Sequence, residues 1–224
     1  MQLIVDNLSL SAGGMTLFRG LSHRFTPGRV TAIVGPSGSG KSTMLAALAG
    51  LHPVAEGRIV VVTNELADRD CRDGAAADLA TFGRPPRSHD VTWIPQGSNA
   101  LPGRTAIDNV MVAPLAAGRT MEEARRVAEH ALGQVGLEHR SGAFARTLSG
   151  GELQRLSLAR GLATTRPFVF ADEPTASLDG ANAARVAEVL AEVTMDATVV
   201  IATHDDLIVR SADACVDLRS YLLT

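Results

Sequence analysis

Lysine is almost missing from this 224-residue chain: Lys41 is the single lysine among 21 basic residues. Cysteine is nearly as scarce, and Cys71 and Cys215 have no metal-ligand spacing, which argues against a disulfide framework and is expected of a reducing cytosol. No apolar run reaches the ~18 residues that cross a bilayer, and Met1 to Asp6 lacks the basic and apolar segments of a signal peptide. With 21 basic against 24 acidic residues the net charge is −3, so we expect no nucleic-acid partner.

What is present suits a globular protein. Hydrophobic residues make up 46% of the chain, charged residues 20%, and the mean hydropathy is +0.12. The length predicts one domain with a substantial core, with or without an inserted subdomain.

The single lysine lies in a glycine-rich stretch that fits the pattern G-x-x-x-x-G-K-[ST]. In such a loop the backbone N–H groups point inward around phosphates, a helix N-terminus adds its positive end, and the lysine reaches the β- and γ-phosphates. Arginine's planar fork does not easily replace that compact charge. The stretch therefore predicts a nucleoside triphosphate site, made by Gly35, Pro36, Ser37, Gly38, Ser39, Gly40, Lys41, Ser42 and Thr43.

The apolar pattern predicts strands that alternate with helices. Strands are expected at 3–10, 29–34, 58–63, 91–94, 167–171 and 198–202, and helices at 43–49, within 105–137 and at 152–162. The continuous apolar runs at 167–171 and 198–202 suit parallel strands covered on both faces. We therefore expect an α/β fold with a helical insertion between about residues 97 and 160. The stretch 64–90 is read as irregular, with at most a short helix.

Two carboxylates follow the predicted strand at 167–171. Asp172 and Glu173 stand at its C-terminal end, where open α/β sheets place their ligands. Asp172 can hold Mg²⁺ together with the Ser42 hydroxyl, and Glu173 can polarise a water aimed at the γ-phosphate. An acidic turn after a core strand is the plainer interpretation, and the upstream phosphate loop argues against it.

A second glycine-rich segment, Leu148 to Glu152, opens a predicted helix. Ser149 and Glu152 have capping-box spacing, so a good helix start is one interpretation. A helix does not need Gly150 and Gly151 to begin, however, and bare N–H groups at a helix N-terminus suit phosphate. One γ-phosphate cannot lie in both loops of a single subunit unless they meet, which suggests two copies sharing the nucleotide.

Together these segments resemble the ATP-binding subunits of ABC transporters. The resemblance covers essentially the whole chain and rests on the phosphate loop, 148–152, Asp172-Glu173, Ser177-Leu178-Asp179 and His204, in the family's order. It implies a P-loop NTPase (RecA-like) core with an N-terminal antiparallel β subdomain and an inserted α-helical subdomain. The whole chain, 1–224, would form a single ATPase domain, with the core in 1–96 and 161–224 and the helical subdomain in 97–160.

The resemblance also implies cofactors, roles and partners. ATP and Mg²⁺ are expected, with Ser42, Gln96 and Asp172 as the metal group and Glu173, His204, Gln96 and Lys41 as the catalytic group. Ser149, Gly150 and Gly151 of one subunit would close over ATP held by a second copy, in a head-to-tail dimer. Asp179 would communicate across that dimer, and His204 would contact the γ-phosphate and orient Glu173. An integral membrane permease would be a separate chain, which places this subunit peripherally on the cytoplasmic face of the membrane.

Two departures from the family pattern stand out. Ala12 falls where an aromatic residue usually stacks on adenine, so nucleotide affinity or base selectivity is expected to be modest unless Phe18 substitutes. The stretch 64–90 does not match the family's short glycine turn and helix.

Three function classes are open at this point. The sequence around 148–155, the compact length and the lack of a C-terminal regulatory domain resemble the lipoprotein-release and macrolide-export subfamily, which favours export of haem, peptide, drug or lipoprotein. A soluble ABC-type ATPase of DNA repair, chromosome maintenance or translation is disfavoured by the missing coiled-coil insertions, cysteine sets and tandem halves. A nucleotide kinase or GTPase is disfavoured by the 148–152 segment and by Asp172-Glu173. The sequence does not identify the transported substrate.

Overall fold

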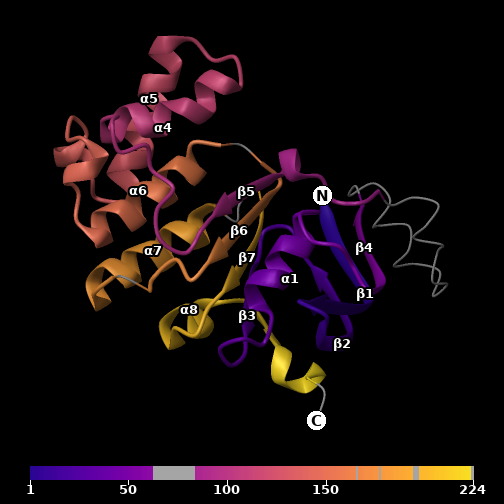
Figure 1. Cartoon of the computed structure of the whole chain (residues 1–224). Coiled ribbons are helices and arrows are strands. Elements are labelled where there is room, and N and C mark those ends of the chain that lie inside the picture. The colour runs from indigo at the N-terminus through magenta and orange to yellow at the C-terminus, as the bar shows by residue number, and fades with distance from the viewer. Residues whose placement is uncertain (63–83, 165, 177, 194–196, 223–224) are drawn as a thin grey trace.

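A computed structural model describes residues 1–62, 84–164, 166–176, 178–193 and 197–222. The predicted irregular stretch lies mostly outside these ranges, and so do Cys71 and Ser177. Two sheets form the body of the molecule, one antiparallel and one parallel (Figure 1).

The antiparallel sheet is N-terminal, as expected. Its strands run in the order β2-β1-β4 and have the bounds β1 (Gln2–Ala12), β2 (Met15–Phe25) and β4 (Glu56–Val62). Gly13 and Gly14 have φ of 58° and 80°, the left-handed conformation that a two-residue hairpin turn between Ala12 and Met15 requires. The strands expected at 3–10 and 58–63 are thus confirmed as β1 and β4, whereas β2 was not among the predicted strands.

The parallel sheet has the order β5-β6-β7-β3-β8. Its strands are β3 (Val30–Val34), β5 (Val91–Ile94), β6 (Phe168–Asp172), β7 (Thr198–Ala202) and β8 (Ala214–Asp217). Every residue of β6 and β7 is buried, which confirms that the continuous apolar runs are covered on both faces. Because all five strands run in one direction, the segments that follow them meet at one edge of the sheet.

Helix α1 (Lys41–Leu48) fills the space between the two sheets. Met44, Leu45 and Leu48 are fully buried in one cluster with side chains from both sheets. The helix begins two residues before its expected start, because the phosphate loop runs directly into its first turn.

Three helices form a unit on the side of the parallel sheet away from the antiparallel sheet (Figure 1). They are α4 (Ala106–Ala116), α5 (Met121–Gln134) and α6 (Gly150–Leu162). The predicted helical stretch 105–137 is divided by Gly118, whose φ of 81° ends one helix, and Thr120 caps the next. Helix α6 begins at Gly150 rather than at 152, because Ser149 is its N-cap, and it extends two residues past the expected subdomain boundary at 160.

Helices α7 (Gly180–Val193) and α8 (Asp206–Ser211), and strand β8, were not predicted from the sequence. Val186, Leu190 and Ile208 cover the second face of the sheet, in one cluster with Val199 and Ile201. Within the described residues no helix is long and apolar enough to cross a membrane.

A buried amide fixes the loop that joins β5 to α4. Asn109, 1% exposed, accepts a hydrogen bond from Leu101 N at 2.7 Å, and its Nδ2 donates to the carbonyl oxygens of Leu101 (3.1 Å) and Thr105 (2.9 Å). Replacing Asn109 with alanine is expected to lower the free energy of unfolding by about 2–3 kcal/mol, because buried backbone groups lose their partners. Urea denaturation would measure the loss.

Glu129→Gln is the matched control for that substitution. Glu129 forms an exposed ion pair with Arg125, and such pairs contribute about 0.2–1 kcal/mol. Equal changes in the two variants would contradict the role given to Asn109.

Candidate functional site

A cavity of about 350 Å³ lies where the parallel strands end. The phosphate loop follows β3, Gln96 follows β5, Glu173 follows β6, and His204 lies two residues beyond β7. The cavity is lined by Leu17, Ser37, Gly38, Gly40, Lys41, Ser42, Thr43, Gln96, Glu173 and His204. The fold therefore brings together residues that are up to 187 positions apart in the sequence (204 − 17).

Three glycines of the phosphate loop are required by its backbone. Gly35, Gly38 and Gly40 have φ of 155°, 79° and 95°, in the region that side chains disfavour. A Cβ at Gly35 would lie 2.6 Å from Ser39 Oγ, and one at Gly40 would lie 3.0 Å from Leu17 Cδ1. The loop thus needs glycine for two reasons: only glycine adopts these φ angles without strain, and there is no room for a Cβ at Gly35 or Gly40.

The N-terminus of α1 is left open toward the cavity. Its N-cap, Gly40, has no side chain to accept a hydrogen bond, and no acidic residue lies in the first turn. Unpaired N–H groups and the positive end of the helix dipole make such a terminus an anion site.

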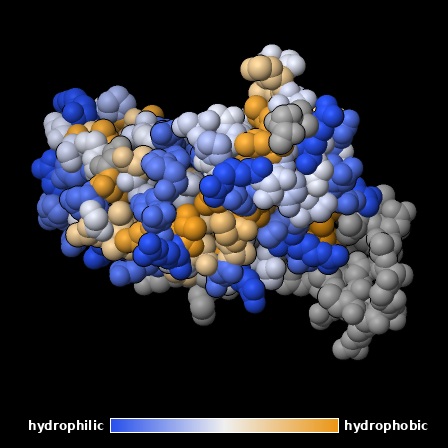
Figure 2. Space-filling model, turned by 90° about the horizontal axis from the view of Figure 1, so that it is seen from below, coloured by the Kyte–Doolittle hydropathy of each residue, from blue (hydrophilic) through white to orange (hydrophobic). Residues whose placement is uncertain are grey.

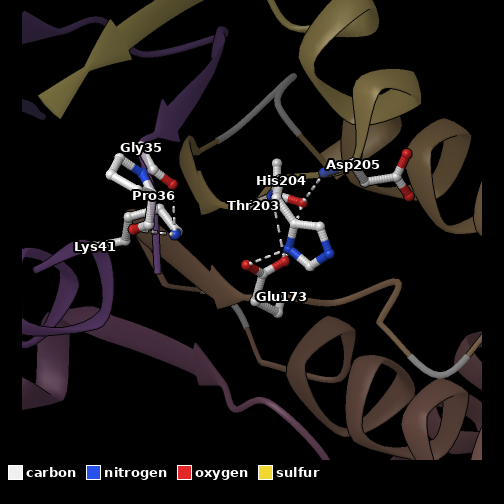
Figure 3. Close-up of polar contacts among 7 residues, drawn as sticks. All are labelled: Gly35, Pro36, Lys41, Glu173, Thr203, His204 and Asp205. Atoms are coloured by element: carbon white, nitrogen blue, oxygen red, sulfur yellow. Dashed lines mark hydrogen bonds and ion pairs between the residues drawn. The ribbon is translucent and has the colours of Figure 1, made fainter. Parts of the chain in front are cut away.

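The Lys41 ammonium is held beside the same loop. Its Nζ donates hydrogen bonds to the carbonyl oxygens of Gly35 at 2.9 Å and Pro36 at 3.3 Å, as Figure 3 shows. The charge therefore stands over the loop that would cradle phosphate, on a stem flexible enough to swing toward it.

Asp172 is a buried carboxylate with an unpaired oxygen. Its residue is 8% exposed, and Oδ1 has no hydrogen-bond partner among the described residues. Burial raises the pKa of Asp172, and the adjacent Glu173 adds to the rise, while the Ser42 hydroxyl and Lys41 lower it. An unsatisfied carboxylate oxygen beside a hydroxyl is an arrangement that suits a hard divalent cation.

Glu173 is held in a strained and well-defined position. It has φ of 46°, a left-handed conformation that costs a non-glycine residue about 1–3 kcal/mol. Its Oε2 accepts from Thr203 Oγ1 at 3.2 Å, and its Oε1 lies 2.8 Å from His204 Nδ1 (Figure 3). The carboxylate is buried, whereas the His204 side chain is 73% exposed. The arrangement places a fixed base at the cavity wall with an accessible imidazole beside it.

The segment that carries Gln96 is attached to α6. Gln154 Nε2 donates to Pro95 O at 3.5 Å, and Arg160 Nη1 donates to Asn99 at 2.5 Å, to both its backbone and side-chain oxygens. Because Gln96 lies between these contacts, the cavity is mechanically connected to the helical unit.

The second glycine-rich segment does not reach this cavity. Ser149 and Glu152 form the capping box that their spacing predicted: Glu152 N donates to Ser149 Oγ at 3.3 Å and Ser149 N to Glu152 Oε2 at 2.8 Å. A Cβ at Gly150 would meet nothing within 4 Å in its own chain. Neither this segment nor Asp179, which caps α7, lines the cavity. Gly35, Pro36, Ser39 and Asp172 do not line it either, but each of them adjoins residues that do.

The side chains that could contact the adenine of a bound nucleotide differ from those that the sequence indicated. Phe18 is fully buried in the core, so it cannot stack on a nucleotide, and Ala12 ends β1 opposite Met15. Leu17 lines the cavity instead. The sequence analysis missed both Leu17 and Thr203. Thr203 could have been found, because it lies just after a buried strand and directly before His204.

Comparison with known proteins gives consistent matches. The family described as "ABC transporter" matches residues 18–176. The arginine transport ATP-binding protein ArgV of Corynebacterium glutamicum is 34% identical over 208 residues, which cover 91% of this chain and 82% of the relative. The lipoprotein-releasing system ATP-binding protein LolD of Novosphingobium aromaticivorans is 36% identical, covering 96% of this chain and 94% of the relative. A dimeric ATP-binding cassette solved in a post-hydrolysis state with ADP and Pi has a TM-score of 0.75 at 26% identity, covering 96% of this chain and 93% of its own.

Proposed function

Since the chain belongs to the ABC transporter family, in which it is an ATP-hydrolysing subunit, we propose that two copies close head to tail around ATP and thereby drive a separate membrane permease. The single observation that carries the proposal is the division of the phosphate-binding elements. Lys41 and the phosphate loop line the cavity, whereas Ser149, Gly150 and Gly151 do not.

The geometry around Gly150 supports a second copy as the missing wall. Gly150 is the first residue of α6, directly after the N-cap Ser149. Its own chain leaves room for a side chain there, so its own packing does not require a glycine. Close approach of another molecule does explain it, and a phosphate at an open helix N-terminus is the chemistry that fits. The dimeric cassette bound to ADP and Pi is a precedent for paired subunits.

Four side chains then have distinct tasks at each nucleotide. Lys41 and the loop N–H groups bind the phosphates, and Glu173 polarises the attacking water as a general base. His204 contacts the γ-phosphate and holds Glu173 through the 2.8 Å contact. Gln96 senses the nucleotide and passes its state to α6 through the Pro95 and Asn99 contacts.

Mg²⁺ is the cation that these residues would hold. Asp172 supplies an unpaired buried oxygen beside the Ser42 hydroxyl, and Ser42 and Gln96 supply further oxygens at the cavity wall. When bound, the ion would neutralise phosphate charge, as it does in other P-loop enzymes.

Asp172→Asn tests this assignment without relying on activity. In the presence of EDTA the variant is expected to unfold at a temperature about 2–4 °C higher than the parent. The reason is that asparagine carries no charge, so the folded variant avoids a desolvation cost of about 1 kcal/mol. Mg²⁺ with ATP should stabilise the parent further and the variant much less. Thermal denaturation followed by circular dichroism would measure both effects.

Asp217→Asn is the control, since Arg219 pairs with Asp217 and lowers its pKa. That variant should gain no stability. Equal stabilisation of parent and Asp172→Asn by Mg²⁺ with ATP would contradict the metal site.

The permease is expected to contact the helical unit. Several apolar side chains are exposed on α4 and on the loops that flank these helices: Leu101, Val112, Leu115 and Phe144. Elsewhere, on the face viewed from below, apolar residues also gather between hydrophilic borders, a composition typical of protein contacts (Figure 2). The subunit would then sit peripherally at the cytoplasmic side of the membrane. The lipoprotein-releasing relatives favour export, and a relative named for arginine transport keeps the substrate and direction open.

Co-purification with a candidate integral membrane permease tests the partner. We expect the permease to retain this chain and to raise its ATP turnover. A chain that hydrolyses ATP as a dimer yet binds no permease would favour the alternative, a soluble ABC-type ATPase.

A further inference from the structure

A chain of polar contacts joins the helix that begins at Ser149 to the segment that follows Glu173. Arg155, in the second turn of α6, donates through Nη1 to the side-chain oxygen of Asn182 in the first turn of α7. The Nδ2 of Asn182 in turn donates to both carboxylate oxygens of Asp179, at 2.9 and 3.0 Å. Two elements that the proposed dimer would present to its partner are therefore linked within one subunit.

The amide of Asn182 is chemically suited to the middle position. It offers an acceptor to a guanidinium on one side and a donor to a carboxylate on the other. Aspartate would have no proton to donate to Asp179, and leucine would serve neither neighbour. The hydrogen bonds from Asn182 lower the pKa of Asp179, and the charge of Arg155 contributes to the same direction.

The helix cap does not need this amide. The backbone N–H of Asn182 donates to Asp179 Oδ1 at 2.9 Å, and Ala183 N donates to Asp179 O at 2.8 Å. The cap of α7 therefore does not depend on the asparagine side chain, and any residue with a backbone N–H at 182 keeps it. A role other than helix capping is left for the side chain, and its contacts point to alignment of α6 with the segment around Asp179.

We propose that Asn182 is a positioning residue that holds Asp179 and the N-terminal end of α6 in the relative placement needed for the two subunits to close. The proposal rests on the shared-nucleotide dimer described above. Because Asn182 and Arg155 are outside the nucleotide cavity, it predicts a loss of turnover without a loss of nucleotide binding.

The test compares Asn182→Leu and Arg155→Met with the parent protein. For each we expect kcat to fall about tenfold, because hydrogen bonds to charged groups are lost, while the affinity of a fluorescent ATP analogue for the isolated subunit stays within about twofold. Arg155→Met keeps the bonds between Asn182 and Asp179 and removes only the link to α6, so it tests the relay even if Asn182→Leu unfolds. Full kcat in Arg155→Met, or a lost affinity that matches the lost turnover, would overturn the proposal.

The double variant Asn182→Leu/Arg155→Met tests whether the two residues act through the same contact. It should be no slower than the slower single variant, since the second substitution removes nothing further. Losses that multiply would overturn the single relay. Arg125→Met, which breaks only an exposed ion pair with Glu129, should keep parental kcat.

Introducing Asn182→Leu into a Glu173→Gln protein distinguishes failure of the Asn182 proposal from failure of the shared-nucleotide dimer on which it rests. If Glu173→Gln alone forms no ATP-dependent dimer by light scattering, the shared-nucleotide function itself is wrong. If it dimerises, and adding Asn182→Leu leaves the ATP concentration needed for dimerisation unchanged, only the positioning role is wrong. We expect that concentration to rise about tenfold.

Discussion

Replacing Glu173 with glutamine is expected to reduce ATP hydrolysis by about 10²–10⁴-fold while leaving ATP binding intact. The amide has the shape of the carboxylate but cannot accept the proton of the attacking water. The phosphate loop, α1 and Lys41 are untouched, so the triphosphate should still bind. Phosphate release would measure turnover, and light scattering should detect an ATP-bound dimer that accumulates because it cannot hydrolyse its nucleotide.

Glu129→Gln is the control, since the same chemical change is made on the exposed surface of α5. It should retain parental turnover and stay monomeric under the same conditions. Parental turnover in Glu173→Gln would contradict the assignment of Glu173, whatever its position beside His204.

Replacing Ser149 with arginine is expected to abolish hydrolysis without weakening ATP binding to an isolated subunit. Ser149 is exposed at the start of α6 and does not line its own subunit's cavity. A bulky cation there would obstruct closure against the partner's nucleotide, so the loss falls on dimerisation. Turnover and the affinity of a fluorescent ATP analogue are the two measurements.

Mixing that variant with Lys41→Ala gives the sharper experiment. In a mixed dimer one composite site has both Lys41 and Ser149 intact, and the other has neither. If hydrolysis tolerates a single intact site, activity lost in each variant alone should partly return on mixing. Loss of ATP binding by monomeric Ser149→Arg would instead assign the loop to its own subunit's site and remove the shared-nucleotide dimer.

The sequence predicted those parts of the site that are local in the chain. The phosphate loop and its following helix are defined by a contiguous pattern, because each glycine is required by the loop's own backbone. Asp172 and Glu173 were found because a buried strand carries them to the edge of the sheet. The Ser149–Glu152 capping box was likewise readable from spacing alone.

The parts that depend on contacts between distant segments were not predictable from the sequence. Leu17 reaches the cavity because β2 passes beside Gly40, which neither Ala12 nor Phe18 revealed. The amphipathic pattern of α7 was not recognised in an alanine-rich stretch, and it is the packing of Val186 and Leu190 on the sheet that defines the helix. The contact between Arg155 and Asn182 follows from how α6 and α7 cross, a relation that no single segment encodes.

The Lys41 ammonium, which donates to the carbonyl oxygens of Gly35 and Pro36, makes nucleotide binding simple to follow by chemical modification of lysine. Acylating reagents that modify lysine side chains have one target in the whole sequence, and that target lines the nucleotide cavity. An α-amine is the other group that such reagents modify, and the two sites are told apart because they lie in peptides of different mass. The extent of acylation at Lys41 would then report nucleotide occupancy without a substitution or a fluorescent nucleotide, including in crude membranes where fluorescent analogues bind many other ATPases.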